Sequence, residues 1–258
     1  MKKLIAFDLD GTLAPSKSSL PDRMAIALIR LLEFYQICVI SGGKFEQFEQ
    51  QLLSNIKAGP DKLANLHIMP TCGTRYYKFN ISKKEWEKVY AEDFTAREKK
   101  KITTVLEKVI DELGYREKQI YGEIIEDRGS QITLSMLGQD IVGVLGEKGL
   151  ELKEAWDPDD AKKNRIRNQA APRLTEFEVR VGGLTSIDVT RPGIDKAYGM
   201  QKLVEQLKIK KEDVLFIGDR LVEGGNDYPV KVMGIDCIEV SDWHSTALIL
   251  EAILAIIN

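Results

Sequence analysis

Two aspartates, Asp8 and Asp10, follow a short apolar run near the start of the chain. Residues 4–7 are continuously apolar, which predicts a buried strand of a parallel sheet. Residues two apart on an extended segment point the same way, so we expect both carboxylates on one side of the strand end. Two carboxylates this close to each other repel. A divalent cation bound between them would offset the repulsion, and protonation of one carboxyl group, which could then act as an acid, would remove it. Two solvated aspartates are the alternative, and the pair needs support from elsewhere.

A second apolar run, residues 37–40, ends at Ser41, Gly42 and Gly43. Glycines let backbone amides approach an anion closely, and a helix that starts near Lys44 would direct its positive end at the same point. This pattern predicts a phosphate-binding turn. An ordinary turn between a strand and a helix is an equal alternative.

Further polar groups stand near the other end of the chain. Lys196 opens a segment of helical period, and Asp219 follows the apolar run 214–217 and a glycine. Asn226 and Asp227 come shortly afterwards in a glycine-rich turn. A lysine on a helix is usually only solvated. Lys196 is a candidate site residue only because the other polar motifs accompany it.

The elements that position these groups are predicted from hydrophobic period. Short, mainly apolar runs predict four more strands, two of them continuously apolar, and the helical period predicts the helices between them. The strands are residues 37–40, 66–69, 214–217 and 237–240, and the helices are residues 21–34, 44–56, 196–207 and 245–256. In an open α/β sheet, ligands bind at the carboxyl ends of the strands, where Asp8, Ser41 and Asp219 would meet.

The middle of the chain has a different character. Residues 76–90 read as a hairpin and 94–113 as an amphipathic helix, while residues 132–136 alternate like a strand with one wet face. A charged helix near 158–168 and strand signals within 177–187 complete the pattern of an α+β module with an antiparallel sheet. We therefore predict an α/β Rossmann-like core with a parallel sheet, formed by residues 1–80 and 187–258, and an inserted α+β domain at 81–186.

Composition excludes several classes of function. The net charge of −3, with both signs interspersed, does not favour nucleic acid or an anionic membrane as a partner. Three widely spaced cysteines and two histidines argue against a structural zinc site and favour free thiols in a reducing cytoplasm. The first apolar run is too short for a signal peptide, and no run is long enough to span a bilayer. A metal here should be a hard ion held by oxygen.

The four motifs in this order resemble the haloacid dehalogenase superfamily of phosphotransferases. They are Asp8-Leu9-Asp10-Gly11-Thr12, Ser41-Gly42-Gly43, Lys196, and Gly218-Asp219 with Gly224-Gly225-Asn226-Asp227. The long insertion after the second motif resembles members with a large cap of the C2 type, in subfamily IIB. The likeness covers nearly the whole chain and is greatest to the eukaryotic-type phosphomannomutases and related sugar-phosphate phosphatases.

The resemblance implies roles for these residues. Asp8 would be the nucleophile and Asp10 the acid and base, while Lys196, Ser41, Gly42 and Asn226 would bind phosphoryl oxygens. Mg²⁺ would be held by Asp8, Asp219 and the backbone carbonyl of Asp10, with Asp227 at the same metal. Phosphoryl transfer to a carboxylate needs this set of groups independently of any family.

The cap is expected to choose the substrate, through Arg128, Gln131, Ser186 and Asp188. One position departs from the mutase pattern, because Gln139 stands where an arginine for a distal phosphate is expected. A neutral amide cannot supply the bidentate charged pairing of an arginine. Basic residues elsewhere in the cap are possible substitutes, namely Lys148, Arg165 and Arg167.

Three functions are open from the sequence. The first is a Mg²⁺-dependent phosphatase of a phosphorylated sugar or similar small metabolite, acting through an aspartyl phosphate. The second is a phosphomannomutase-like isomerase of hexose 1- and 6-phosphates, and the third is a non-catalytic phosphometabolite-binding protein. We expect a cytoplasmic protein with a small phosphorylated metabolite as its partner, monomeric or homodimeric through the cap.

Overall fold

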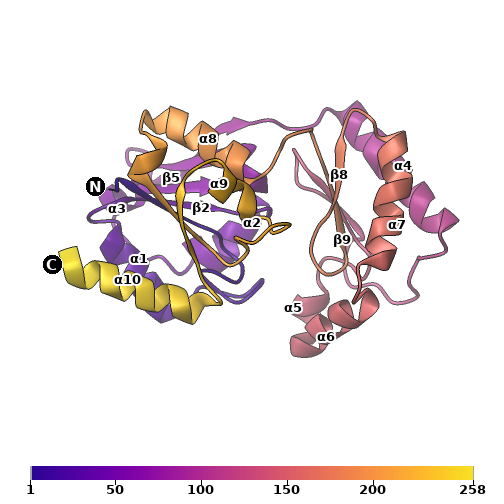
Figure 1. Cartoon of the computed structure of the whole chain (residues 1–258), viewed down its shortest axis with the longest axis horizontal. Coiled ribbons are helices and arrows are strands. Elements are labelled where there is room, and N and C mark those ends of the chain that lie inside the picture. Colours follow the sequence, from indigo (N-terminus) through magenta and orange to yellow (C-terminus); the bar gives the residue numbers. More distant parts are fainter. Residues whose placement is uncertain (1, 258) are drawn as a thin grey trace. The chain divides into compact units, whose positions relative to one another are not determined.

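The computed structural model describes residues 2–257, which form two compact units (Figure 1). The core unit comprises Met1–Ala91 and Ile194–Asn258, and the inserted unit comprises Glu92–Gly193. Both divisions lie further along the chain than the limits of 81 and 186 predicted from the sequence. The reason is strand pairing, because residues 85–91 belong to the sheet of the core unit and residues 186–190 to that of the inserted unit. The roles of catalytic core and substrate-selecting cap stay predictions.

The core unit contains a seven-stranded sheet in the order β11-β10-β1-β2-β3-β4-β5. The strands from β11 to β3 run parallel, and the hairpin β4-β5 adds an antiparallel edge. Their bounds are β1 (Leu4–Phe7), β2 (Gln36–Ile40), β3 (Leu66–Met69), β4 (Arg75–Asn80), β5 (Glu85–Ala91), β10 (Val214–Gly218) and β11 (Asp236–Glu239). The predicted parallel sheet is confirmed, and the four further strands predicted from the sequence correspond to β2, β3, β10 and β11.

Helices cover both faces of this sheet. Alternate residues of β1 face opposite ways: Ile5 and Phe7 pack in one apolar cluster with α1 and α10, and Leu4 and Ala6 pack in another with α8 and α9. The helical segments are α1 (Asp22–Leu31), α2 (Phe45–Phe48), a π-helical turn (Glu49–Leu53), α3 (Pro60–Leu63), α8 (Lys196–Leu207), α9 (Tyr228–Val232) and α10 (Trp243–Ile257). Burial on both faces explains why the strands are continuously apolar.

The inserted unit has a four-stranded antiparallel sheet in the order β6-β7-β9-β8. Its elements are α4 (Ala96–Glu112), β6 (Ile125–Asp127), β7 (Ile132–Ser135), α5 (Ile141–Leu145), α6 (Glu147–Trp156), α7 (Ala161–Ala170), β8 (Glu178–Val181) and β9 (Ser186–Thr190). The helices α4 and α7 pack on its apolar face. The predicted α+β module is confirmed, whereas α5 and α6 were not predicted from the sequence.

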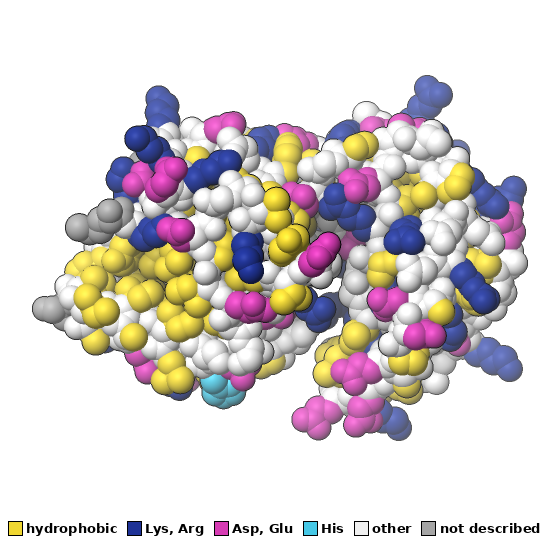
Figure 2. Space-filling model, in the orientation of Figure 1, with side chains coloured by type: hydrophobic (Ala, Val, Ile, Leu, Met, Phe, Trp, Pro, Cys, Tyr) yellow, Lys and Arg dark blue, Asp and Glu magenta, His cyan; other side chains and the backbone are white. Residues whose placement is uncertain are grey.

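The surface agrees with the modest net charge of the sequence. On the face drawn in Figure 2, basic and acidic side chains are interspersed over both units. Within residues 2–257, none of the helices combines the length and the apolar character needed to cross a membrane.

Candidate active site

Three of the predicted site residues directly follow neighbouring parallel strands of the core sheet. Asp8 follows β1, Ser41 follows β2 and Asp219 follows β10, and β1 pairs with both of the other strands. The Asp8 amide donates to the Ile217 carbonyl at 3.1 Å, which extends the pairing to the strand end. The carboxyl edge of the sheet therefore holds these side chains together, as in other open α/β sheets.

Lys196 lies at the centre of the acidic groups. Its Nζ is 2.5 Å from Asp8 Oδ1 and 2.5 Å from Asp227 Oδ1, and the side chain of Lys196 is fully buried. The second oxygen of Asp227 accepts a hydrogen bond from the Arg220 amide at 3.1 Å. A buried ammonium ion is costly unless it is paired, so this lysine has a specific place in the cluster rather than a solvated one.

Close packing of α8 sets the depth of Lys196. A methyl group on Gly199 of α8 would lie 2.5 Å from the Cys72 carbonyl oxygen, and one on Gly73 would lie 2.4 Å from the Cα of Gly199. Only glycines permit this approach of the first turn of α8 to the loop after β3. The side chain of Asp195 caps the helix by accepting from the Tyr198 amide at 2.9 Å.

Burial and charge act in opposite directions on the ion pair. Burial raises the pKa of the Asp8 carboxyl, as do the nearby Asp227 and Asp219, whereas Lys196 lowers it. Burial alone would lower the pKa of Lys196, but the carboxylates of Asp8 and Asp227 outweigh it and raise that pKa above its usual value. The net effect raises the pKa of Asp8 to about 8 even beside Lys196, so further positive charge at this cluster would favour the ionised carboxylate.

A third acidic side chain, that of Asp219, completes a group that could hold a cation. Asp8, Asp219 and Asp227 each offer an oxygen, and these oxygens lie within 4.8 Å of one another. Burial raises the pKa of Asp219, as does the charge of Asp227. The carboxylates outnumber the one lysine between them, and hard oxygen donors are the ligands that Mg²⁺ prefers. The residues present thus fit a divalent cation.

Asp10 is held by a different set of partners. Its Oδ1 accepts from the Lys17 amide at 2.7 Å and from Gln51 Nε2 at 3.2 Å, and its Oδ2 accepts from Gln47 Nε2 at 2.9 Å. The sequence did not single out these glutamines, because an amide on an amphipathic segment gives no chemical signal by itself. The segment also differs from prediction: instead of one helix over 44–56, α2 continues as a π-helical turn that ends at Leu53.

The predicted phosphate-binding residues fall into two environments. Ser41 is buried, and its Oγ accepts from the Gly43 amide at 3.4 Å. Gly42 is partly exposed beside it, and Asn226 is exposed in the turn that precedes the buried Asp227. Their role in binding phosphate stays a prediction.

The loop after β3 has an unfavourable backbone conformation, and it donates hydrogen bonds to the loop that contains Ser41. Thr71 and Cys72 have φ of 50° and 54°, in the left-handed region, and their amides donate to the carbonyls of Gly43 at 2.9 Å and Ser41 at 3.0 Å. Residues other than glycine and asparagine lose about 1–2 kcal/mol each in this region. The loop therefore stores strain beside the predicted phosphate-binding turn.

Replacing Cys72 should release part of this strain. We expect Cys72→Asn to raise the free energy of unfolding by about 0.5–1 kcal/mol, because asparagine tolerates the left-handed region. Cys72→Ala is the matched control, since it removes the thiol but keeps the backbone penalty. Denaturant titration of both variants measures the effect, and an asparagine variant no more stable than the alanine variant would contradict the strain.

The predicted cap residues lie on the polar face of the sheet in the inserted unit. Asp188 Oδ1 accepts from Thr133 Oγ1 at 2.7 Å and from Gln131 Nε2 at 3.0 Å. Ser186 lies two residues before Asp188 on β9, and Arg128 Nε donates to Glu126 Oε2 at 2.7 Å. Arg128 also donates to the Gln139 side chain at 3.5 Å. The structure thus brings Gln131 together with Asp188, and Arg128 together with the position that departs from the mutase pattern.

The other basic candidates lie on helices. Arg165 and Arg167 belong to α7, whose Ile166 packs with Ile187 and Val189 on the apolar face of the sheet. That face is opposite the one that carries Asp188, because β9 alternates. Lys148 lies on α6. This placement does not favour α7 as the source of a second phosphate site.

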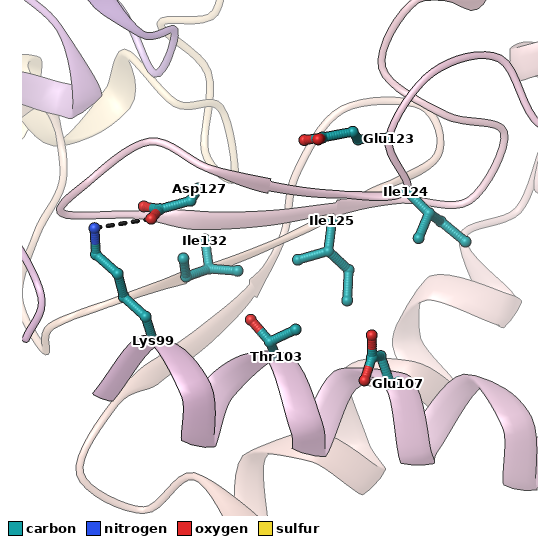
Figure 3. Close-up of a pocket in the computed structure, with 8 residues that line it drawn as sticks. All are labelled: Lys99, Thr103, Glu107, Glu123, Ile124, Ile125, Asp127 and Ile132. Atoms are coloured by element: carbon teal, nitrogen blue, oxygen red, sulfur yellow. Dashed lines mark ion pairs between the residues drawn. The ribbon is translucent and has the colours of Figure 1, made fainter. Parts of the chain in front are cut away.

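A hollow of about 350 Å³ in the inserted unit is not the predicted site (Figure 3). It lies between α4 and the segment around β6, with Lys99 and Asp127 forming an ion pair of 2.8 Å at one end. Ile125 and Ile132 line it, and they pack on the apolar side of the sheet. None of Arg128, Gln131, Ser186 and Asp188 lines it.

Comparison with known proteins identifies the family. A family model for haloacid dehalogenase-like hydrolases matches residues 5–229. The chain belongs to this family. The match confirms the family predicted from the four motifs, and the predicted fold class with it.

Individual relatives are distant in sequence, and their matches span most of this chain. A phosphomannomutase of Encephalitozoon cuniculi is 27% identical over 232 residues, which cover 89% of this chain and 84% of the relative. The IMP-bound, N-terminally truncated IMP-nucleotidase of Plasmodium falciparum superposes with a TM-score of 0.69 at 20% identity, covering 98% of this chain and 68% of that one. A haloacid dehalogenase-like hydrolase of Bacteroides thetaiotaomicron gives a TM-score of 0.61 at 18% identity, covering 98% and 100%. The family match and the relatives confirm the prediction of a hydrolase of this family that is similar to phosphomannomutases, while the superposed structures establish the shared fold.

Proposed function

We propose that this protein is a phosphatase of small phosphorylated metabolites that acts through an aspartyl phosphate on Asp8. The observation that carries the proposal is the buried pairing of Asp8 with Lys196 at 2.5 Å, next to Asp219 and Asp227 at one sheet edge. A protein that only binds phosphate needs positive charge, whereas a buried carboxylate would repel the ligand. The arrangement therefore supports catalysis over the non-catalytic binding protein.

The first half of the reaction transfers the phosphoryl group to the protein. A carboxylate oxygen of Asp8 attacks phosphorus, and the bond between phosphorus and the ester oxygen breaks. Asp10, two residues along, donates the proton that the leaving alcohol takes up. The charge on the non-bridging oxygens is met by Lys196 and by hydrogen bonds from the Ser41 turn.

The second half regenerates the enzyme. Asp10, now a carboxylate, accepts a proton from a water molecule as the water oxygen attacks phosphorus. The bond between phosphorus and the Asp8 oxygen breaks, inorganic phosphate leaves, and Asp8 returns as a carboxylate. Each half is an in-line displacement, and the two together consume one water for each ester.

A divalent cation fits this site as the resident cofactor. Asp8 and Asp219 would hold it, with the backbone carbonyl of Asp10 as the family resemblance implies, and Asp227, which also pairs with Lys196, would lie at the same cation. When bound, Mg²⁺ supplies positive charge to the phosphoryl oxygens and to the two carboxylates that would otherwise repel them.

Removal of the metal should therefore abolish turnover. We expect hydrolysis to stop in EDTA and to return with added Mg²⁺, and excess Ca²⁺ to inhibit because the larger ion accepts more oxygen ligands and could bind both oxygens of the nucleophile. Phosphate release after dialysis into each metal measures this. Undiminished turnover in EDTA would contradict the metal proposal.

The inserted unit would select the organic part of the substrate. On its polar face Arg128, Ser186 and Asp188 are partly exposed and Gln131 is buried against Asp188, a set of polar groups that would suit the hydroxyl groups of a sugar or a similar metabolite. A cytoplasmic location, and a monomer or a homodimer through this unit, stay predictions.

A phosphomannomutase-like isomerase is the second candidate. It is favoured by relatives named phosphomannomutase that match this chain over most of their length. A mutase must retain a bisphosphate intermediate. Gln139, beside Arg128, offers a distal phosphate an amide donor without positive charge, whereas an arginine at that position would add a charge and a bidentate pair of donors. The intermediate would therefore dissociate or react with water, which supports the phosphatase.

One assay separates the two functions. Mannose 1-phosphate, mannose 6-phosphate and IMP are incubated with enzyme and Mg²⁺, and free phosphate and isomerised product are measured together, with and without a catalytic bisphosphate. We expect phosphate release from a hexose monophosphate to exceed isomerisation, and Gln139→Arg to shift the ratio toward isomerisation. Efficient isomerisation by the unmodified protein with little free phosphate would overturn the ranking.

A further inference from the structure

Asp10 lies in a cradle of hydrogen bonds that the reaction as described does not use. Both of its carboxylate oxygens accept side-chain amide hydrogens, Oδ2 from Gln47 Nε2 at 2.9 Å and Oδ1 from Gln51 Nε2 at 3.2 Å. A donor on each oxygen fixes rotation about the bond between Cβ and Cγ. The carboxylate plane is therefore set by these two side chains and by the Lys17 amide on Oδ1.

The two glutamines also bind each other and their surroundings. Gln47 Nε2 donates to Gln51 Oε1 at 2.6 Å, and Gln51 Nε2 donates to the Ser18 carbonyl at 2.9 Å. The Gln51 carbonyl accepts from the Leu20 amide at 2.7 Å. Gln51 is only 5% exposed, so it has few alternative partners in solvent. The segment after Asp10 is thereby tied to the same helix that orients its carboxylate.

Gln47 connects this cradle to the predicted phosphate-binding turn. A methyl group on Gly43 would lie 2.2 Å from Gln47 Oε1, so the side chain passes directly over that glycine. Gln51 belongs to the π-helical turn Glu49–Leu53, which interrupts the regular helix. Such turns recur at functional sites because they redirect side chains.

We infer that Gln47 and Gln51 are positioning residues that hold the Asp10 carboxylate in register with the Ser41 turn for proton transfer in both halves of the reaction. An amide suits this role because it neither gains nor loses a proton, so it orients Asp10 without competing with it. The inference rests on the proposed function and adds residues to its machinery.

Leaving-group dependence tests the inference. An alkyl phosphate such as glycerol 3-phosphate releases an alcohol that must be protonated, whereas p-nitrophenyl phosphate releases a phenolate that needs no proton. In Gln51→Met, and in the double variant with Gln47→Met, we expect kcat for the alkyl ester to fall about 10- to 100-fold with KM changed less than about threefold, since general acid and base catalysis contributes about 10²- to 10⁴-fold.

The aryl ester should behave differently in the same variants. Its first half needs no acid, but water attack still needs Asp10 as a base, so we expect a burst of nitrophenolate of about one equivalent per active site before a slow steady rate. Gln50→Met is the matched control, because Gln50 is an exposed neighbour on the same segment, and it should keep wild-type rates. Thermal unfolding of each variant reports its fold.

The outcomes separate the two proposals. Wild-type activity on both esters, unchanged in the glutamine variants, would overturn the positioning role alone. Equal losses on both esters without a burst, or a rise in KM at constant kcat, would also overturn it. A wild-type protein inactive toward both esters with Mg²⁺ would overturn the proposed function and this inference together.

Discussion

Asp8→Asn should leave less than about 1% of wild-type phosphatase turnover, because an amide can neither attack phosphorus nor bind a cation as an anion. The fold should survive, since the carboxylate of Asp227 still pairs with Lys196 at 2.5 Å when Asp8 is neutral. Steady-state phosphate release and thermal unfolding measure the two effects. Asp61→Asn, at an exposed position on α3, is the matched control and should keep full activity. More than a few per cent of residual turnover in purified Asp8→Asn would show that another group is the nucleophile.

Lys196→Met should strongly reduce both the free energy of unfolding and the phosphatase turnover. The change leaves the buried carboxylates of Asp8 and Asp227 without their shared cation, and breaking a buried ion pair from one side costs about 3–5 kcal/mol. Turnover should fall below detection, because nothing else on α8 replaces the positive charge at the nucleophile.

Denaturant titration and phosphate release measure the effects of this substitution. Lys100→Met, at an exposed position on α4, is the control and should change the free energy of unfolding by less than about 0.5 kcal/mol. A loss of stability below about 1 kcal/mol in Lys196→Met, or activity within tenfold of wild type, would contradict the buried pairing.

The parallel sheet, and the edge of it that carries the candidate site residues, could be predicted because burial on both faces leaves a clear pattern in the sequence. Continuous apolar runs mark β1, β2 and β10, and Asp8, Ser41 and Asp219 stand within two residues of the ends of these runs. The helix predicted over 196–207 coincides with α8. Where burial alone determines the structure of a segment, its hydrophobic pattern is sufficient to predict that structure.

Features that depend on pairing between distant segments could not be predicted in the same way. The hairpin of β4 and β5 reads as half-exposed sheet whichever unit it joins, so the predicted domain limits at 81 and 186 differ from the division in the structure. The burial of Lys196 depends on the approach of Gly199 to Gly73, which no local pattern signals. Gln47 and Gln51 are likewise meaningful only beside Asp10.

The central claim is that Asp8 carries the phosphoryl group between two displacements, and the stereochemistry at phosphorus tests it most directly. A phosphate monoester made chiral at phosphorus with oxygen isotopes is hydrolysed in isotopically labelled water, and the configuration of the inorganic phosphate is determined. Each displacement inverts phosphorus, so transfer through Asp8 predicts overall retention of configuration. Inversion would mean that water attacks the ester directly in a single displacement, and it would contradict the account.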